Sequence, residues 1–348
     1  MHNLSERKLK ILSAIVEMYI KTGEPVGSKA LSSVLNFTAS PATIRNEMAE
    51  LVELGLLEQP HTSAGRIPSS QGYRFYINEI MNPKPISDKE QRFIYGNLNV
   101  AHFSAEELIN RALKLLAEAT NLVALSTNPK QLNSKISSVQ AIQTGPKSGI
   151  VILIISSDDV VTANFQCEYE LNAELIKIYN RMLIQIFKNI AITSVNEDFI
   201  RKSLLSMGEI SIIMSPVLKA VLKAANEALK TQLSLQGQTN LLLLPEYDLT
   251  SAKQTLDFLN REEDLVAFTE LDNNTTKIII GNETQCPELV NSSIVLSKYF
   301  IGNNKSGVIG VVGPKRMDYA KTVAQIKYLA KIIGELLDSD DDSEYQTI

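Results

Sequence analysis

Hydrogen-bonding side chains gather on one face of a single expected helix, which begins at Ser40. The Ser40 side chain can accept a hydrogen bond from the first turn, and Pro41 suits the first helical position because it lacks an N–H. Apolar residues follow at one-turn spacing on one face: Ile44, Met48 and Leu51. The opposite face carries small or hydrogen-bonding residues, mostly in its N-terminal half: Ala42, Arg45, Asn46 and Ala49. Such residues in this half of a helix are typical of contacts to base edges in a DNA major groove.

The side chains of this face suit different parts of a base pair. Asn46 can form two hydrogen bonds with adenine, and Arg45 can reach guanine or a flanking phosphate. Ala42 and Thr43 are placed to contact thymine methyl groups. Together with the capping residue Ser40, these four residues form the expected DNA-binding set of the helix.

A hairpin is expected directly after this helix, which Gly55 ends. Its strands are LLEQP and IPSSQGYRFY, and the turn between them is HTSAGR, in which Gly65 suits a positive φ. We expect Arg66 to contact the phosphate backbone or the minor groove and to strengthen binding to all sequences. The expected DNA-binding residues of the hairpin are His61, Thr62, Ser63, Arg66 and, beyond the turn, Arg74.

Two helices expected upstream complete a recognisable order of elements. Apolar residues from Leu4 to Tyr19 form one face of a helix that stops at Thr22, and VGSKALSSVL forms a short second helix. A tight turn over residues 36–39 then leads to the capped helix. This is the order of a winged helix-turn-helix. The competing interpretation is an ordinary surface helix beside a hairpin, and the upstream helices favour DNA binding over it.

The charge of this segment is unusual for a DNA-binding domain, which often has a large positive excess. Over residues 1–78, lysines and arginines are interleaved almost evenly with glutamates. Attraction to phosphate must then depend on how the charges are sorted among the faces of the domain. We expect modest non-specific affinity and a greater dependence on base contacts and on dimerisation.

Whole-chain composition bounds the class of protein. The 348 residues allow two or three domains, and 44% hydrophobic with 21% charged residues indicate a globular chain. No apolar run reaches about 18 residues and no signal-peptide core precedes the first helix, so we expect a cytoplasmic protein without membrane contact. Cys167 and Cys286 are expected to be free thiols, and the three histidines lack the spacing of a metal site.

No pattern of residues indicates catalysis or a bound cofactor. The chain has no GxSxG sequence, no Cys/His pair and no carboxylate pair around an apolar pocket, so we expect no enzymatic activity. The glycines of residues 302–313 fail the spacing of phosphate-binding loops and are expected in a hairpin turn and a closely packed strand. The run DSDDDSE lacks the Gly and distal Glu of a calcium loop and is expected to be a solvated tail.

The hydrophobic pattern changes twice beyond residue 80. Three short β-branched runs follow a helix that begins after Ser104, helical texture takes over near 171, and strands return after about 270. Strands interrupted by a mostly helical block indicate an insertion into one α+β domain. The expected divisions are 1–80 for the winged helix, 81–103 for a linker, 104–170 and 266–337 for the two parts of the α+β domain, 171–265 for the insert and 338–348 for an acidic tail.

Three blocks of sequence resemble one family over the whole length of the chain. The runs GEPVGSKALS, SPATIRNEMAELVELGLLEQPHTSAGRIPSSQGYRFYI and IGVVGPKRMDYAKTV are similar to the HrcA family of heat-inducible transcription repressors of bacteria. The resemblance implies an α+β multidomain fold with an N-terminal winged helix-turn-helix and a GAF-like domain interrupted by a dimerisation insert. It also implies a homodimer that binds the CIRCE inverted repeat before chaperone operons, with a GroEL-type chaperonin as partner and no cofactor.

Two other functions compete with repression by simple occupancy of DNA. In the first, a winged-helix regulator binds a small effector in its GAF-like domain, and the effector alters DNA affinity. No charged cluster among the expected strands is fit to hold a phosphate, which favours a structural role for that domain. In the second, the chain is a chaperone-client interaction protein with only non-specific nucleic-acid binding.

Overall fold

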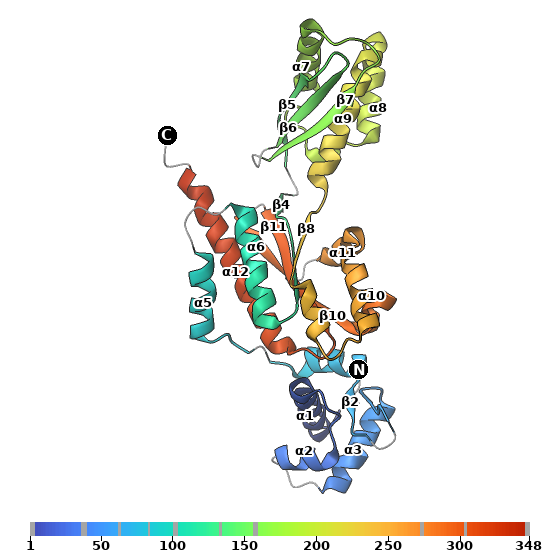
Figure 1. Ribbon diagram of the computed structural model, residues 1–348, viewed down its shortest axis with the longest axis vertical. Helices are drawn as coiled ribbons and strands as arrows, with labels where there is room; N and C mark the ends of the chain where they lie inside the picture. The colour runs from blue at the N-terminus through green and yellow to red at the C-terminus, as the bar shows by residue number, and fades with distance from the viewer. Residues whose placement is uncertain are drawn as a thin grey trace. The chain divides into compact units, whose positions relative to one another are not determined.

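The computed structural model of the chain divides into two compact units. Unit 1 comprises Met1–Asn128, Leu233–Ile301 and Gly307–Ile348, and unit 2 comprises Pro129–Gln232 and Gly302–Ser306. The described residues are 4–35, 40–61, 64–82, 84–99, 104–131, 134–155, 159–271, 275–302 and 305–344, with backbone alone at 130–131 and 339–344. Figure 1 shows the order of the helices and strands along the chain.

The N-terminal part of unit 1 folds as a winged helix-turn-helix, as the sequence predicts. Three helices precede a two-stranded antiparallel wing, in which Leu57 pairs with Pro68 and Glu58 pairs with Ile67. The turn expected over residues 36–39 lies outside the described residues. The elements are α1 (Glu6–Thr22), α2 (Ser28–Val34), α3 (Pro41–Glu53), β1 (Leu57–Glu58) and β2 (Ile67–Pro68).

The predicted apolar faces of α1 and α3 meet in the core of this domain. Ile11 and Ile15 of α1 are fully buried, as is Leu51 of α3, and they belong to one hydrophobic cluster. Gly23 ends α1 with a φ of 74°, and Gly55 follows α3 with a φ of 73°. Both helices thus stop where glycine permits the left-handed conformation.

The second wing strand is shorter than the sequence analysis expects. Only Ile67–Pro68 forms a strand, because Ser69 caps a new helix: its Oγ accepts a hydrogen bond from the Gly72 N–H at 2.9 Å. The run SQGYRFY therefore turns away from the wing as helix and not as strand. It comprises α4 (Ser70–Phe75) and the π-helical turn η1 (Tyr76–Ile80).

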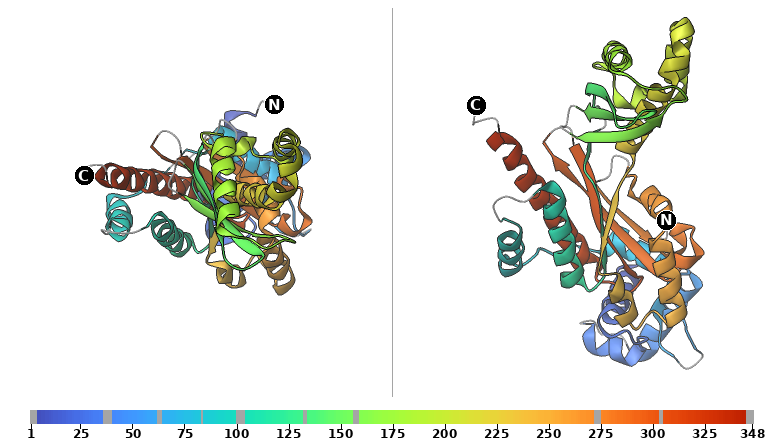
Figure 2. Two further views of the ribbon diagram at one scale, coloured as in Figure 1. Left: turned by 90° about the horizontal axis from the view of Figure 1, so that it is seen from above. Right: turned by 45° about the horizontal axis from the view of Figure 1, so that its top comes forward.

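A sheet of strand order β8-β3-β11-β10-β9 forms the centre of unit 1. Its strands alternate residues between two apolar clusters: Ala124 belongs to the cluster that contains α6 and α12, whereas Val123 and Leu125 belong to the one that contains α10 and α11. Helices therefore cover both faces of the sheet (Figure 2). The elements are α6 (Ala105–Thr120), β3 (Val123–Thr127), β8 (Leu233–Gln236), η4 (Gln238–Leu243), α10 (Leu249–Leu259), α11 (Glu262–Thr269), β9 (Thr276–Ile280), η5 (Gly281–Thr284), η6 (Pro287–Leu289), β10 (Ser292–Ile301), β11 (Lys305–Pro314) and α12 (Tyr319–Glu344).

The glycine-rich segment forms a turn and a closely packed strand, as predicted. Gly302 has a φ of 54° in the turn after β10. In β11, a Cβ added at Gly310 would lie 2.2 Å from the Val295 carbonyl oxygen, and one at Gly307 would lie 2.3 Å from the Tyr299 ring. These glycines serve close packing within the sheet.

Unit 2 is an antiparallel meander covered by helices. Strands β5, β6 and β7 pair in that order, and Val151 and Leu153 of the central strand are fully buried with Tyr179 and Phe187 of α7. The short strand β4 (Lys130–Gln131) pairs with residues 305–306. The other elements are β5 (Ile136–Gln143), β6 (Ser148–Ile155), β7 (Val160–Gln166), α7 (Ala173–Phe187), η2 (Ile192–Ser194), α8 (Glu197–Ser206), η3 (Gly208–Ile210) and α9 (Ser211–Leu229).

The compact units differ in extent from the divisions expected from sequence. The boundary expected at 171 falls inside unit 2, between β7 and α7, and the one expected at 265 falls within α11 of unit 1. The reason is that the meander shares its core with α7 and α9 and not with the sheet of unit 1. Alternation of residues identifies a strand but not the sheet that it joins.

Helices occupy parts of the two segments that flank the α+β domain. Within 81–103, which the sequence predicts to be a linker, helix α5 (Asp88–Leu98) buries Ile94 and Leu98. The backbone of α12 continues through the acidic run to Glu344, past the end expected at 337. No Gly or Pro interrupts those residues.

Unit 2 is joined to unit 1 at neighbouring strand ends. Thr127, the last residue of β3, pairs with Leu233, the first residue of β8. Replacing residues 129–232 by one glycine would leave Asn128 and that glycine as a two-residue type I′ turn. We expect the shortened chain to keep the sheet of unit 1. Thermal unfolding monitored by circular dichroism should then show one cooperative transition. A non-cooperative transition would show that unit 1 depends on unit 2.

Candidate nucleic-acid interface

The first turn of α3 is fixed by its cap. Ser40 Oγ accepts a hydrogen bond from the Thr43 N–H at 3.2 Å and lies 3.0 Å from Thr43 Oγ1. Pro41 occupies the first turn, as predicted. Ser40 is exposed and Thr43 is half-buried. Their hydroxyl groups therefore make the cap and can also be reached by a partner outside the helix.

The opposite face of α3 is exposed. Ala42, Arg45, Asn46 and Ala49 are all exposed, whereas Ile44 and Met48 on the inner side are buried. Within the described part of the chain, no hydrogen bond or ion pair engages the side chain of Arg45 or Asn46. Three of the residues that the sequence predicts for base contacts, Ala42, Arg45 and Asn46, thus share one accessible face, whereas Thr43 is half-buried.

Two of the three acidic residues of α3, Glu47 and Glu50, are paired with α1. Arg7 Nε donates to Glu47 Oε1 at 2.8 Å, and Lys8 Nζ lies 2.6 Å from Glu50 Oε2. The hydrogen bond to Glu50 raises the pKa of Lys8, which stays protonated. These pairs offset two negative charges near α1, so Arg45 provides a positive charge on the outer face. Charge is thus only partly sorted by face in α3, because the third acid, Glu53, is exposed two turns beyond Asn46.

The base of the wing is held against the segment before α2. Val26 and Arg66 exchange two backbone hydrogen bonds of 2.9 Å. A Cβ at Gly65 would lie only 2.4 Å from the Val26 carbonyl oxygen. The expectation of a positive φ at Gly65 is wrong, because the glycine is required by this close approach and its φ is not positive.

The predicted wing residues differ in their accessibility. His61 is exposed, and its carbonyl accepts a hydrogen bond from the Ala64 N–H at 2.9 Å. Arg66 is half-buried at the base of the wing, and its Nη1 donates to the Ala64 carbonyl at 3.4 Å. Thr62 and Ser63 lie outside the described residues.

Arg74 is engaged away from this surface. Its Nε donates to Glu283 Oε1 at 2.8 Å, and its Nη2 donates to Glu283 Oε2 at 2.5 Å and to the Ile278 carbonyl at 2.7 Å. Burial raises the pKa of Glu283, but the hydrogen bonds from Arg74 and the Ile280 N–H outweigh it and leave the pKa below its ordinary value. This pair therefore stabilises the fold at neutral pH and is lost as the pH falls through the lowered pKa. The predicted contact of Arg74 with DNA would therefore require this pair to break.

Sequence reasoning did not identify the residues that support this interface. Arg7 and Lys8 position α3 through Glu47 and Glu50, yet they lie about 40 residues away along the chain. The even balance of basic residues and glutamates over residues 1–78 was the available signal that glutamates of this domain are paired. Periodicity alone could not show which basic residue pairs with which acid.

Other kinds of site find little support. In the described part of the chain, no helix is long and apolar enough to cross a membrane. Among the same residues, no group of three His, Cys, Asp or Glu side chains could hold a metal ion. Cys167 and Cys286 are free thiols, the first buried and the second half-buried.

A capped helix with an open polar face, set beside a wing, defines a winged-helix DNA-binding protein. The profile described as "Winged helix-turn-helix transcription repressor, HrcA DNA-binding" matches residues 3–81, and "HrcA protein C terminal domain" matches 106–323. The chain belongs to the HrcA family of heat-inducible transcription repressors, which are not enzymes.

Bacterial relatives support this assignment over nearly the whole chain. The "Heat-inducible transcription repressor HrcA" of Ruminiclostridium cellulolyticum is 34% identical over 95% of this chain and 97% of its own. Those of Clostridioides difficile and Lachnoclostridium phytofermentans are 34% and 33% identical, over 95% and 97% of this chain and 99% of each relative. A solved structure described as a hypothetical protein has a TM-score of 0.61 at 24% identity, covering 97% of this chain and 99% of that one, which shows the fold alone.

The exposed amide of Asn46 generates a prediction about base selectivity. Asn46→Ala should weaken binding by about 1–3 kcal/mol per half-site and relax the preference at one base position. Asn97→Ala, the same substitution in α5, is the matched control and should change neither. Titration of single-base variants of the operator measures both effects. Unchanged affinity and selectivity in Asn46→Ala would mean that α3 docks differently.

The half-buried guanidinium of Arg66 generates a prediction about salt. Arg66→Ala should weaken binding to all DNA sequences about equally and lower the slope of log affinity against log salt by about one unit. Arg66→Lys keeps the charge and should keep the slope. Binding measured over a range of salt concentrations separates the two variants. An effect confined to specific sites, with the slope unchanged, would contradict a phosphate contact.

Proposed function

We propose that this protein represses heat-shock chaperone operons by occupying the CIRCE inverted repeat as a homodimer in the cytoplasm. The observation that carries the proposal is the outer face of α3. There Arg45 and Asn46 are exposed and have no partner among the described residues, while Glu47 and Glu50 are paired with α1. Two such faces, related by a two-fold axis, would enter successive major grooves of an inverted repeat. The bound dimer would block transcription.

We assign the base contacts residue by residue on this face. Asn46 pairs with adenine, Arg45 reaches guanine or a phosphate, and Ala42 and Thr43 meet thymine methyl groups. Ser40 adds a hydroxyl at the N-terminus of the helix. His61, Thr62, Ser63 and Arg66 extend the contact to the phosphate backbone or the minor groove.

We propose that unit 2 is the dimerisation insert of a GAF-like domain formed by the sheet of unit 1. Several apolar side chains of unit 2 are exposed: Ile178, Ile184, Leu205 and Ile212. Pairing such residues between two copies would remove apolar surface from water. The resemblance to HrcA proteins supports the same assignment.

A ligand-sensing GAF-like domain is the second candidate. Both faces of the sheet are occupied by apolar side chains, including Leu116 and Ile326 on one side and Phe258 and Leu265 on the other. Among the described residues these two apolar clusters contain no charged side chain that could hold an anionic effector, so we favour a structural role for this domain.

A GroEL-type chaperonin would keep the repressor in its active fold. Heat-unfolded proteins would compete for the chaperonin, and repression would then lapse without a dedicated ligand. Two features of the chain are typical of proteins that need a chaperonin to fold. The sheet of unit 1 is assembled from segments separated by unit 2, and β6 carries the β-prone run GIVILII.

A mobility-shift titration tests the whole proposal. The wild-type protein should bind the inverted repeat more tightly than scrambled DNA, lose activity on warming, and regain it with chaperonin and ATP. Full activity after refolding without chaperonin would contradict the chaperonin mechanism and favour an effector. Equal affinity for repeat and scrambled DNA would contradict a sequence-specific repressor.

The variant in which one glycine replaces residues 129–232 tests the role of unit 2. It should sediment as a monomer and lose about 10²–10⁴-fold in affinity for the inverted repeat, because the two half-sites are no longer bound by linked domains. Its affinity for an isolated half-site should be unchanged. A shortened chain that still sediments as a dimer would move the interface to unit 1, most directly to α12.

A further inference from the structure

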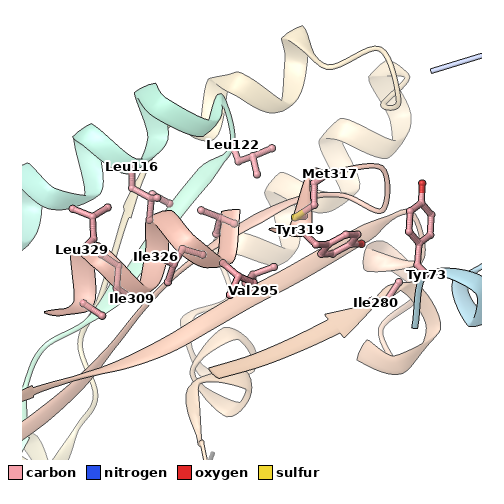
Figure 3. Packing of buried hydrophobic residues seen from close by; sticks show 14 of the residues in the cluster. Tyr73, Leu116, Leu122, Ile280, Val295, Ile309, Met317, Tyr319, Ile326 and Leu329 are labelled. Atoms are coloured by element: carbon pink, nitrogen blue, oxygen red, sulfur yellow. The ribbon is translucent and has the colours of Figure 1, made fainter. Parts of the chain in front are cut away.

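The winged-helix domain, residues 4–80, and the sheet domain, the rest of unit 1, share one apolar cluster. Tyr73 of α4 is buried, and its ring centroid lies 5.8 Å from that of Tyr319 at the start of α12. Figure 3 shows Tyr73 beside Tyr319 and Ile280. An apolar contact of this kind is non-directional and does not by itself fix the orientation of a domain.

Arg316 makes a directional contact to the end of α1. Its Nη1 donates to the Ile20 carbonyl at 2.7 Å, and its other nitrogens bind Glu246 of the sheet domain. Ile20 lies in the last turn of α1, where carbonyl groups lack helical partners and carry negative partial charge. Gly23 lies beside the guanidinium: a Cβ there would be in ordinary contact, 3.4 Å from Arg316 Cζ, and the positive φ of 74° is what favours glycine.

Arg74 makes a second directional contact, from α4. It binds both oxygens of Glu283 and the Ile278 carbonyl, which belong to the sheet domain. A bidentate arginine–carboxylate pair fixes geometry more strictly than a single hydrogen bond. Arg74 and Arg316 thus join two different helices of the winged-helix domain to the sheet domain. These two points, together with the shared apolar cluster, restrict rotation of one domain on the other.

Two buried atoms beside these contacts indicate that the contact is not optimised for stability alone. Tyr73 Oη and Glu246 Oε2 have no hydrogen-bonding partner among the described residues. Leaving such atoms unpaired opposes the docked arrangement. Departures of this kind from complete pairing are expected where a functional geometry is held.

We propose that Arg74 and Arg316 are positioning residues that lock the winged helix on the sheet domain and so determine which half-site spacing the dimer accepts. The proposal rests on the dimeric repressor proposed above. Because α3 packs on α1, holding α1 also holds the recognition face. Each base pair inserted between half-sites rotates one of them by roughly 34° about the DNA axis, so a locked dimer should tolerate little change in spacing.

The test compares full-length wild type with the double variant Arg74→Gln/Arg316→Gln on three kinds of DNA. These are the inverted repeat, repeats with two base pairs inserted or removed at the centre, and an isolated half-site. The matched control is Arg261→Gln, because Arg261 pairs with Glu288 at 2.6 Å within the sheet domain. Arg74→Gln alone keeps the Arg316 contact and serves if the double variant does not unfold cooperatively.

We expect wild type and Arg261→Gln to lose about tenfold or more in affinity when the spacing changes. The double variant Arg74→Gln/Arg316→Gln and the single variant Arg74→Gln should lose much less, while their affinity for the isolated half-site equals that of wild type. A wild-type spacing preference in these variants would overturn this inference alone. The inference would also be overturned if these variants lost as much affinity for the isolated half-site as for the inverted repeat. The contacts of Arg74 and Arg316 would then be merely structural. Failure of wild type to prefer the repeat would overturn the proposed function as well.

Discussion

Helix α3 must bury one face against α1 while its opposite face stays free of partners, and the rest of the structure follows from this constraint. Ile44, Met48 and Leu51 satisfy the first condition, and the ion pairs of Glu47 and Glu50 keep acidic charge beside α1. The second condition leaves Arg45 and Asn46 exposed and unpaired within the described residues. A nearly neutral domain can thus present a face that suits DNA.

The remainder of the chain controls where that face lies. Unit 1 joins the winged helix to a helix-covered sheet through Tyr73, Arg74 and Arg316, so DNA recognition and sheet packing share one cluster. The chain leaves this sheet after Thr127 to form unit 2 and returns to it at Leu233, and these two residues pair with each other. A segment attached in this way can change in sequence or length without altering the two strands that flank it.

Local signals in the sequence predicted the elements of the winged helix well. Ser40, Pro41 and Gly55 fixed α3, and its exposed residues are those that helical periodicity selects. Contacts between distant segments were not predictable in this way. The pairing of Arg74 with Glu283 spans 209 residues, and the meander shares its core with α7 and not with the sheet of unit 1. The requirement for Gly65 likewise comes from the Val26 backbone, which no local pattern contains.

Footprinting of the wild-type protein on the inverted repeat tests repression by two recognition helices most directly. Methylation protection should reveal two equal sets of guanines in the major groove, related by the two-fold axis of the repeat and separated by a whole number of helical turns. Hydroxyl-radical protection should extend beyond them where the wings meet the backbone. Protection of one half-site alone, or an even loss of reactivity along the whole fragment, would contradict a symmetric dimer that reads DNA through α3.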